Sequence, residues 1–280
     1  EQIVLEVAIF RHPRGNIDML LPHKFSVNTI DSIEDERSPA VFVCGYGATR
    51  RTETSDYSPS SARRSRGLRY QRIAGLFEDH IALRPLQSWL PKLQYQKSRD
   101  IYEDAIDLIN KAMPETIRFG GEVEEEDEQY IFYFHGDRTP YTSLSDGYKT
   151  YIAWVGDLVG NLADVATSNL RLRDIEGIVL VDEIDLHMHP EWQRSVITTL
   201  SSAFPKLQFV FTTHSPLVAS TVRKENVFLT DRDDTGKPIV KQIQETIFGR
   251  RIEDILLSSY FGLRTTKPRE LEHSAQQIFD

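Results

Sequence analysis

The sequence of 280 residues is poor in the features that mark secreted and membrane proteins. Cys44 is its only cysteine, so no disulfide can form within the chain. Because Cys44 follows the apolar run 41–43, we expect a buried structural thiol rather than a nucleophile. No apolar stretch approaches the roughly 18 residues of a membrane span, and the first residues lack the basic and then apolar layout of a signal peptide. These absences predict a cytoplasmic chain with no membrane partner.

Positive charge is also scarce. The chain carries 33 Lys and Arg against 42 Asp and Glu, a formal net charge of −9, so bulk charge does not indicate a nucleic-acid binder. Residues 50–72 depart from this balance, with seven arginines against Glu53 and Asp56. This stretch is either a solvated loop or a contact for ATP phosphates or for the backbone of DNA or RNA. Its arginines are Arg50, Arg51, Arg63, Arg64, Arg66, Arg69 and Arg72.

Two apolar runs near the middle of the chain end in polar residues. The run 178–181 is followed by the acidic pair 182–183. The run 209–211 is followed by residues 212–214, which read Thr-Thr-His. Short apolar runs of this kind predict buried central strands of a parallel sheet, where ligands bind beyond the carboxyl ends of the strands. We therefore expect a nucleotide site at that edge.

A third polar segment, residues 144–150 (LSDGYKT), opens a helix whose apolar face runs from Ile152 to Val165. Such a turn can form a cradle for phosphate, and Gly147 would let the backbone approach the ligand closely. A simple helix cap is the alternative for Ser145. Strand, helix and strand in succession imply a right-handed parallel crossover. The predicted fold is thus α/β, with a parallel sheet flanked by helices.

The acidic pair suits magnesium chemistry. Mg²⁺ keeps several waters and takes one or two carboxylates together with phosphate oxygens, a role that Asp182 can fill. In an extended chain Glu183 points away from Asp182, so we expect it to reach an attacking water as a general base. The alternative is a pair of solvated carboxylates that only end a strand.

The chain divides into four predicted regions. Residues 1–75 hold N-terminal strands and the arginine-rich loop, and residues 76–142 hold a helical subdomain with an acidic loop. Residues 143–230 carry the core motifs, and residues 231–280 form a peripheral β-hairpin and C-terminal helices. The expected elements are strands at 1–10, 39–44 and 130–134, helices within 76–113, over 192–200 and over 252–257, an acidic hairpin tip at 122–128 and a hairpin turn at 234–236.

Three sequence motifs resemble those of a known family. Residues 181–193 (VDEIDLHMHPEWQ), 204–209 (FPKLQF) and 213–218 (THSPLV) are similar to bacterial SMC/OLD-like AAA ATPases of the ABC type. That group includes the PtuA-type ATPases of Septu and retron-linked anti-phage systems. The resemblance implies ATP and Mg²⁺ as cofactors. It also implies a role for each matching residue: Asp182 orients magnesium, Glu183 polarises water, His214 contacts the γ-phosphate, Asp185 lies in the D-loop at the dimer contact, and Ser145, Gly147 and Lys149 bind the γ-phosphate of ATP held by the opposite subunit.

The same resemblance implies how the protein works. It implies that ATP-driven dimerisation, into a homodimer or a higher oligomer, regulates a partner effector, expected to be a nuclease, in bacterial anti-phage defence. Two other interpretations stay open: the ATPase subunit of an ABC transporter, and a structural module that does not hydrolyse ATP. The G-x-x-x-x-G-K-[ST] phosphate loop of the family occurs nowhere in the chain. We therefore expect that an N-terminal P-loop segment is missing, with a degenerate partner subunit as the alternative.

Two further clusters invite a metal interpretation. His187 and His189 could join Asp185, but alternate residues on one short loop seldom suffice for zinc. Asp231 and Asp233 could imitate the paired carboxylates of a Toprim nuclease, but the Thr-Gly that follows favours a hairpin turn. We expect neither cluster to bind a metal.

Overall fold

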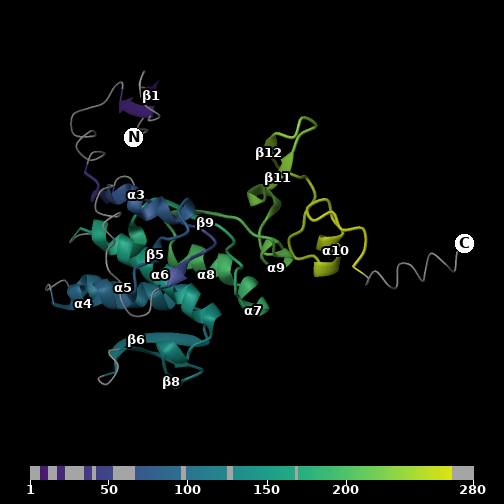
Figure 1. Cartoon of the computed structure of the whole chain (residues 1–280). Coiled ribbons are helices and arrows are strands. Elements are labelled where there is room, and N and C mark those ends of the chain that lie inside the picture. Colours follow the sequence, from purple (N-terminus) through teal and green to yellow (C-terminus); the bar gives the residue numbers. More distant parts are fainter. Residues whose placement is uncertain are drawn as a thin grey trace, which may run out of the picture.

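The structure is a computed structural model of the chain (Figure 1). It describes residues 7–11, 18–22, 35–39, 42–52, 67–95, 99–124, 129–167 and 170–266. Figure 1 shows an α/β core, with a small antiparallel sheet at its lower edge and a C-terminal arm to one side. No helix in these ranges combines the length and the hydropathy that a bilayer crossing requires.

The core is built on a parallel sheet of three strands. β3 (Phe42–Tyr46), β9 (Gly177–Val181) and β10 (Leu207–Phe211) lie in the order β10-β9-β3, with β9 in the centre. Both neighbours run parallel to β9, and the last residue of each outer strand, Phe211 or Tyr46, pairs with Val181, the last residue of β9. The strands therefore end level at one edge. This confirms the predicted α/β fold with a parallel sheet.

The main helix of the core is α6 (Asp146–Val165). Its apolar residues recur at helical spacing, and the side chains of Trp154, Val155 and Leu158 are fully buried. They pack in one cluster with residues of β3 and of α5 (Arg99–Ala112). Full burial of each such side chain stabilises the fold by about 1.5–3 kcal/mol. The helix that opens at the predicted phosphate loop is thus fixed against the sheet.

The opposite face of the sheet is less covered. Ile178 of β9 and Val210 of β10 are 41% and 48% exposed, whereas Val179 is fully buried. Side chains alternate between the two faces along a strand. Within the described part of the chain, the expectation of buried strands therefore holds on one face of β9 and is wrong on the other.

The crossover from β9 to β10 contains two helices rather than the one predicted. These are α7 (Pro190–Gln193) and α8 (Val196–Ala203). Between them the N–H of Ser195 donates to the carbonyl of Trp192 at 3.0 Å. This three-residue spacing is tighter than that of an α-helix and interrupts the continuous helix.

A second sheet lies between α5 and α6 in the chain. Its strands β6 (Ile117–Val123), β7 (Tyr130–Phe134) and β8 (Asp137–Pro140) are antiparallel neighbours in that order. The N–H of Glu124 donates to the carbonyl of Gln129 at 2.7 Å, and residues 125–128 of the predicted acidic tip lie outside the described residues. The predicted strand 130–134 is confirmed and pairs antiparallel with β6, whereas β8 was not predicted.

The helical spacing over 76–113 is only partly confirmed. α5 and α4 (Leu86–Tyr95) fall inside it, but β5 (Ala82–Leu83) forms a short strand beside β4 (Arg51–Thr52). Arg84 precedes a proline, and a residue in that position favours extended backbone. The helix therefore begins only after this point.

The remaining elements are short. The C-terminal hairpin and the helix near residue 252 confirm the predictions for that region. The first strand was predicted at 1–10; the structure has a strand at 7–11, and residues 1–6 lie outside the described residues. These elements are β1 (Val7–Arg11) antiparallel to β2 (Asp18–Pro22), α3 (Leu68–Ile73), α9 (Pro216–Ala219), β11 (Leu229–Arg232) antiparallel to β12 (Pro238–Lys241), α10 (Ile252–Leu256), and the 3-10 turns η2 (Ala74–Leu76), η3 (Tyr141–Ser143), η4 (Leu172–Asp174) and η5 (Lys224–Asn226).

Candidate functional site

The loops that leave the three parallel strands meet at one edge. The N–H of Asp182 donates to the Tyr46 carbonyl at 2.8 Å, and the N–H of Thr212 donates to the Val181 carbonyl at 3.0 Å. These bonds continue the sheet by one residue beyond the strands. The structure thus brings the acidic pair beside residues 212–214, as the strand ends predicted.

Two threonines hold the acidic side chains at this edge. The Thr212 hydroxyl donates to Oδ1 of Asp182, and the Thr213 hydroxyl donates to Oδ1 of Asp185. A carboxylate has about four acceptor positions, so each side chain keeps capacity for a further ligand. These roles of Thr212 and Thr213 were not predicted, although hydroxyl residues directly after a buried strand were a usable signal.

Glu183 has a left-handed backbone, with φ of +48°. Its N–H donates to the Thr212 hydroxyl oxygen at 2.7 Å, and its carbonyl accepts from the N–H of Leu186 at 3.0 Å. The chain has therefore turned out of the strand here, so the strand alternation from which we expected Glu183 to point away from Asp182 does not apply. Such a conformation costs a non-glycine residue about 1 kcal/mol or more, so neighbouring contacts must hold it.

Arg50 is one of those contacts. It is 5% exposed, donates from Nε to the Gly47 carbonyl at 3.2 Å, and donates from Nη2 to the carbonyls of Asp182 and Glu183. Burial lowers the pKa of Arg50 to about 10, and the nearby carboxylates, that of Asp182 foremost, oppose the shift. The interpretation of Arg50 as part of a solvated or nucleic-acid-binding loop is therefore wrong, because its guanidinium points into the protein.

The other end of the arginine-rich stretch is buried as well. Arg72 in α3 is 6% exposed, and its guanidinium carbon lies 5.6 Å from the centre of the Phe42 ring. Burial lowers the pKa of Arg72. Arg63, Arg64 and Arg66 lie outside the described residues, so a contact between them and DNA or RNA stays a prediction.

The predicted phosphate loop lies directly before α6. Ser145 occupies the N-cap position, is exposed, and makes no capping hydrogen bond through its side chain. Lys149 follows one turn later, with Nζ 3.8 Å from the Asp146 carboxylate. At Gly147 a Cβ atom would lie only 2.3 Å from the carbonyl oxygen of His187. The glycine is thus required by the contact between this segment and the turn that contains His187. We had predicted a different reason, the close approach of the backbone to a phosphate.

Side chains of α7 join these loops to one another. The rings of Tyr148 and Trp192 meet edge to face with centroids 4.1 Å apart. Gln193 donates from Nε2 to the Met188 carbonyl at 2.9 Å and accepts at Oε1 from the Ser215 hydroxyl at 2.6 Å. The start of α6, the turn after β9 and the turn after β10 are therefore one connected unit.

The histidines at this edge differ in their surroundings. His214 is exposed. His189 caps α7, with Nδ1 accepting from the N–H of Glu191 at 3.4 Å, and His187 is exposed with a φ of +60°. In the part of the chain that the structure describes, no group of three or more His, Cys, Asp or Glu side chains could hold a metal ion. The geometry of the described residues therefore does not support a zinc site at this loop.

The acidic residues of the C-terminal hairpin serve its turn. Oδ1 of Asp233 accepts from the N–H groups of Thr235 and Lys237 at 2.8 and 2.9 Å, and hydrogen bonds to Thr235 and to the backbone lower the pKa of Asp233. Asp231 pairs with Lys241 at 2.5 Å. The hairpin interpretation of these two aspartates is confirmed.

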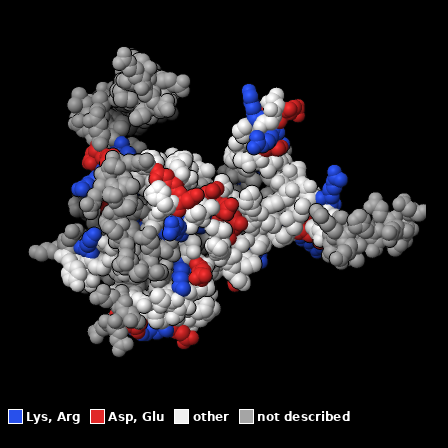
Figure 2. All heavy atoms as spheres, in the orientation of Figure 1, with Lys and Arg blue, Asp and Glu red and all other residues white. Residues whose placement is uncertain are grey.

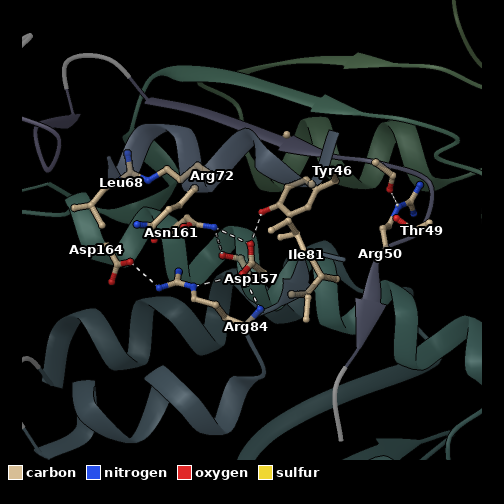
Figure 3. Close-up of a pocket in the computed structure, with 16 residues that line it drawn as sticks. Tyr46, Thr49, Arg50, Leu68, Arg72, Ile81, Arg84, Asp157, Asn161 and Asp164 are labelled. Atoms are coloured by element: carbon tan, nitrogen blue, oxygen red, sulfur yellow. Dashed lines mark hydrogen bonds and ion pairs between the residues drawn. The ribbon is translucent and has the colours of Figure 1, made fainter. Parts of the chain in front are cut away.

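A cavity of about 90 Å³ lies beside the end of β3 (Figure 3). Asp157 of α6 is its central acceptor, bonded by the Tyr46 hydroxyl at 3.0 Å, by Nδ2 of Asn161 at 2.7 Å and by the Arg84 N–H at 3.0 Å. Arg84 also bonds Asp164 at 2.7 Å. The Arg84 cation attracts both carboxylates, and a polar cavity of this size accommodates ordered water. We assign this cluster the role of joining α6 to β3.

Residues 47–220 match the protein family described as "AAA domain, putative AbiEii toxin, Type IV TA system". The chain belongs to this AAA family. The matched region contains Arg50, the start of α6, the acidic pair and residues 212–214, which together build the edge of the sheet. The AAA assignment thus covers the same residues that the structure brings together.

Several known proteins are similar to this AAA chain. The Septu protein PtuA of Bacillus mycoides (strain KBAB4) is 30% identical over 235 residues, covering 84% of this chain and 31% of that protein. "Retron Vc95 probable ATPase" of Vibrio cholerae serotype O1 biovar El Tor is 34% identical over 142 residues, covering 51% of this chain and 26% of that protein. A solved structure from work on ATP-driven dimerisation and DNA-stimulated activation of SMC ATPases is 16% identical, with a TM-score of 0.39, and covers 55% of this chain and 89% of that chain.

These matches confirm the predicted resemblance to AAA ATPases of Septu and retron systems. The chain spans about a third or less of the length of the two curated relatives. What the whole protein does is therefore a matter for proposal.

Proposed function

We propose that this domain binds and hydrolyses ATP at the edge of the parallel sheet. The observation that carries the proposal is the acidic pair, which follows the central strand and is held there by Thr212 and Arg50. Membership of an AAA family supports a nucleotide as the ligand. The carboxyl edge of a parallel sheet is also where ligands of such folds bind.

The carboxylate oxygens at this edge suit Mg²⁺ as ligands. The ion prefers oxygen ligands and combines one or two carboxylates with water and phosphate oxygens. Asp182 is half-buried and fixed through one oxygen by Thr212, so it is the proposed magnesium ligand. When bound, the ion neutralises charge on the phosphates.

Glu183 is the proposed general base. Its left-handed backbone removes Glu183 from the strand geometry of Asp182, and we assign base chemistry to Glu183 and metal binding to Asp182. His214, exposed after the neighbouring strand, is the proposed contact for the γ-phosphate. The three residues thus come from the ends of two adjacent strands.

A second copy of the chain completes the proposed site. Ser145, Gly147 and Lys149 are proposed to bind the γ-phosphate of ATP held by the opposite subunit, with Asp185 at the dimer contact. The exposed Ser145, without a capping bond at the start of a helix of 20 residues, supports an anion site there. Dimerisation is then part of the reaction.

We place this ATPase in anti-phage defence, where ATP-driven dimerisation regulates a partner effector of the nuclease class. The support for this step is the similarity to proteins named for Septu and retron systems.

Replacement of Glu183 by Gln, in the protein that contains this chain, tests the proposed function. Turnover should fall by about 10² or more because the general base is lost, while ATP binding should persist because Asp182 remains. A steady-state ATPase assay and a nucleotide titration measure the two effects. The control Glu225→Gln, at an exposed glutamate, should keep the parent rate. Equal ATPase rates in Glu183→Gln and the parent would remove Glu183 from the mechanism.

A further inference from the structure

The Arg50 side chain joins two loops of the acidic edge through main-chain oxygens. Nη2 donates to the carbonyls of Asp182 and Glu183, and Nε donates to the carbonyl of Gly47 at 3.2 Å. Arg50 follows β3 and the acidic pair follows β9, its neighbour in the sheet. Figure 3 shows Arg50 on the opposite side of Tyr46 from Asp157, apart from the polar cluster of the cavity.

The acidic edge and the buried cation hold each other in place. Main-chain carbonyls solvate a guanidinium but do not neutralise it, and a buried charge is costly without compensation. The carboxylates of Asp182, Asp185 and Glu183 supply that compensation. Arg50 is therefore attracted to the edge by side chains while its hydrogen bonds restrain the main chain.

The peptide groups around Glu183 are fixed at two points. Its N–H donates to the Thr212 hydroxyl at 2.7 Å, and its carbonyl accepts from Arg50. Its φ of +48° is one that surrounding contacts have to impose. Without the bond from Arg50, the carbonyl keeps the N–H of Leu186 as its partner but loses the tie to the neighbouring strand.

We infer that Arg50 is the positioning residue for Glu183. The inference rests on the proposed function, because Glu183 acts as a base only if its carboxylate is held toward the attacking water. Arg50 fixes the main chain from which that carboxylate projects, and a displacement of about 1 Å at a reacting group can cost about 10² in rate. A lysine keeps the charge but donates from one point, whereas the planar guanidinium reaches carbonyls on two loops.

The test compares Arg50→Lys and Arg50→Met with Arg51→Met, the same kind of change at the adjacent, exposed arginine. In the protein that contains this chain, both Arg50 variants should lower kcat for ATP at least about 10-fold and change KM less than about 3-fold. Arg51→Met should keep both constants. Unchanged kcat in Arg50→Lys and Arg50→Met, or a loss confined to KM, would overturn the inference.

A second measurement needs no ATPase activity. Hydrogen–deuterium exchange of peptides spanning 181–188 should speed up in Arg50→Lys, while peptides of α6 keep the parent rate. Parent-like exchange in 181–188, or faster exchange throughout the core, would overturn the positioning role. If the parent protein hydrolyses no ATP, the proposed function fails, and the exchange result still decides whether Arg50 fixes this turn. If Arg50→Met does not fold, Arg50→Lys alone decides between the two outcomes.

Discussion

Gly147 shows how packing can require a residue that a motif assigns to ligand binding. The loop before α6 and the turn after β9 approach so closely that the His187 carbonyl occupies the space of a side chain. Tyr148, the next residue, continues the same contact through the ring of Trp192. The glycine thus joins the two loops whether or not a phosphate is present.

Replacement of Gly147 by Ala should lower the free energy of unfolding. The added Cβ would lie 2.3 Å from a backbone oxygen, so one of the two loops must shift. Overpacking of this kind costs about 1–3 kcal/mol. Urea unfolding measures the loss. In the control Gly120→Ala the nearest atom lies 3.4 Å away, at the end of the Glu122 side chain, and the change should stay within about 0.5 kcal/mol. Equal stability of the two variants would show that the loops adjust freely.

The two buried arginines mark where residue-by-residue interpretation failed. Charge counting treats an arginine in a polar stretch as solvated. Arg50 instead donates hydrogen bonds to two carbonyls after β9, and the Arg72 guanidinium lies over the ring of Phe42. These partners lie in other segments of the chain, so no local pattern could indicate them.

At the scale of elements, β3 and α6 share a buried polar contact. The Tyr46 hydroxyl donates to Asp157 at 3.0 Å, and Sγ of Cys44 lies 3.5 Å from the same hydroxyl. Burial raises the pKa of Cys44 to about 12 and raises the pKa of Tyr46 well above its ordinary value. Both groups are therefore neutral near pH 7, and the prediction of a buried structural thiol at Cys44 is confirmed.

The free energy of unfolding should fall at alkaline pH, because the groups buried between β3 and α6 ionise more readily in the unfolded chain. The Cys44 thiol has a pKa near 9.0 in the unfolded chain and near 12 in the folded one. A raised folded pKa gives stabilisation that is complete below the unfolded value and is lost as pH rises through the interval, by up to about 1.4 kcal/mol per pH unit. Tyr46 acts in the same direction.

Urea unfolding across that interval measures the effect. The free energy of unfolding of the parent should fall as pH rises above about 9, and that of Cys44→Ala should fall less steeply. Parallel pH profiles for the two proteins would mean that the Cys44 thiol does not contribute.

At the scale of the whole molecule, the charge distribution can be followed on one face of the protein (Figure 2). On the face shown in Figure 2, acidic side chains gather across the middle of the core, and the described Lys and Arg side chains are scattered. The net charge of −9 agrees with this view. Arg63, Arg64 and Arg66, which lie outside the described residues, therefore stay the predicted contact for DNA or RNA.

Replacement of Arg63, Arg64 and Arg66 by Ala should weaken nucleic-acid binding equally across sequences. It should also lower the slope of log affinity against log salt, by about 0.7–0.9 for each phosphate that the protein no longer neutralises. Fluorescence anisotropy at several salt concentrations measures both, and ATPase activity should persist. The matched control replaces three exposed arginines elsewhere, Arg171, Arg223 and Arg251. Parent-like affinity of the first triple variant at matched salt would leave this stretch as a linker or a protein contact.

Replacement of Ser145 by Arg should abolish ATP-dependent dimerisation. The larger cationic side chain fills the proposed contact with the opposing γ-phosphate, while the acidic pair of the same chain is untouched. Light scattering with and without ATP measures assembly, and a nucleotide titration should show that binding survives. Ser201→Arg, on the exposed side of α8, is the control and should dimerise as the parent does. ATP-dependent dimers of Ser145→Arg would contradict the site shared between subunits.

Local sequence patterns determined the main strands and the main helix of this protein. The apolar runs predicted β9 and β10, the periodic residues after Ile152 predicted α6, and polar residues after the strands predicted where the acidic pair would lie. These predictions succeeded because strand alternation, helical periodicity and the level ends of parallel strands depend on neighbouring residues. The family resemblance added the roles proposed for the acidic edge.

Tertiary structure decided how that edge is held. The bond from Thr212 to Asp182, the carbonyls that Arg50 reaches and the approach of Gly147 to His187 each join segments that are distant in the sequence. Their strength depends on burial and on geometry between loops, which composition and spacing do not encode. The same holds for the open face of β9, because only packing determines which side of an apolar strand a helix covers.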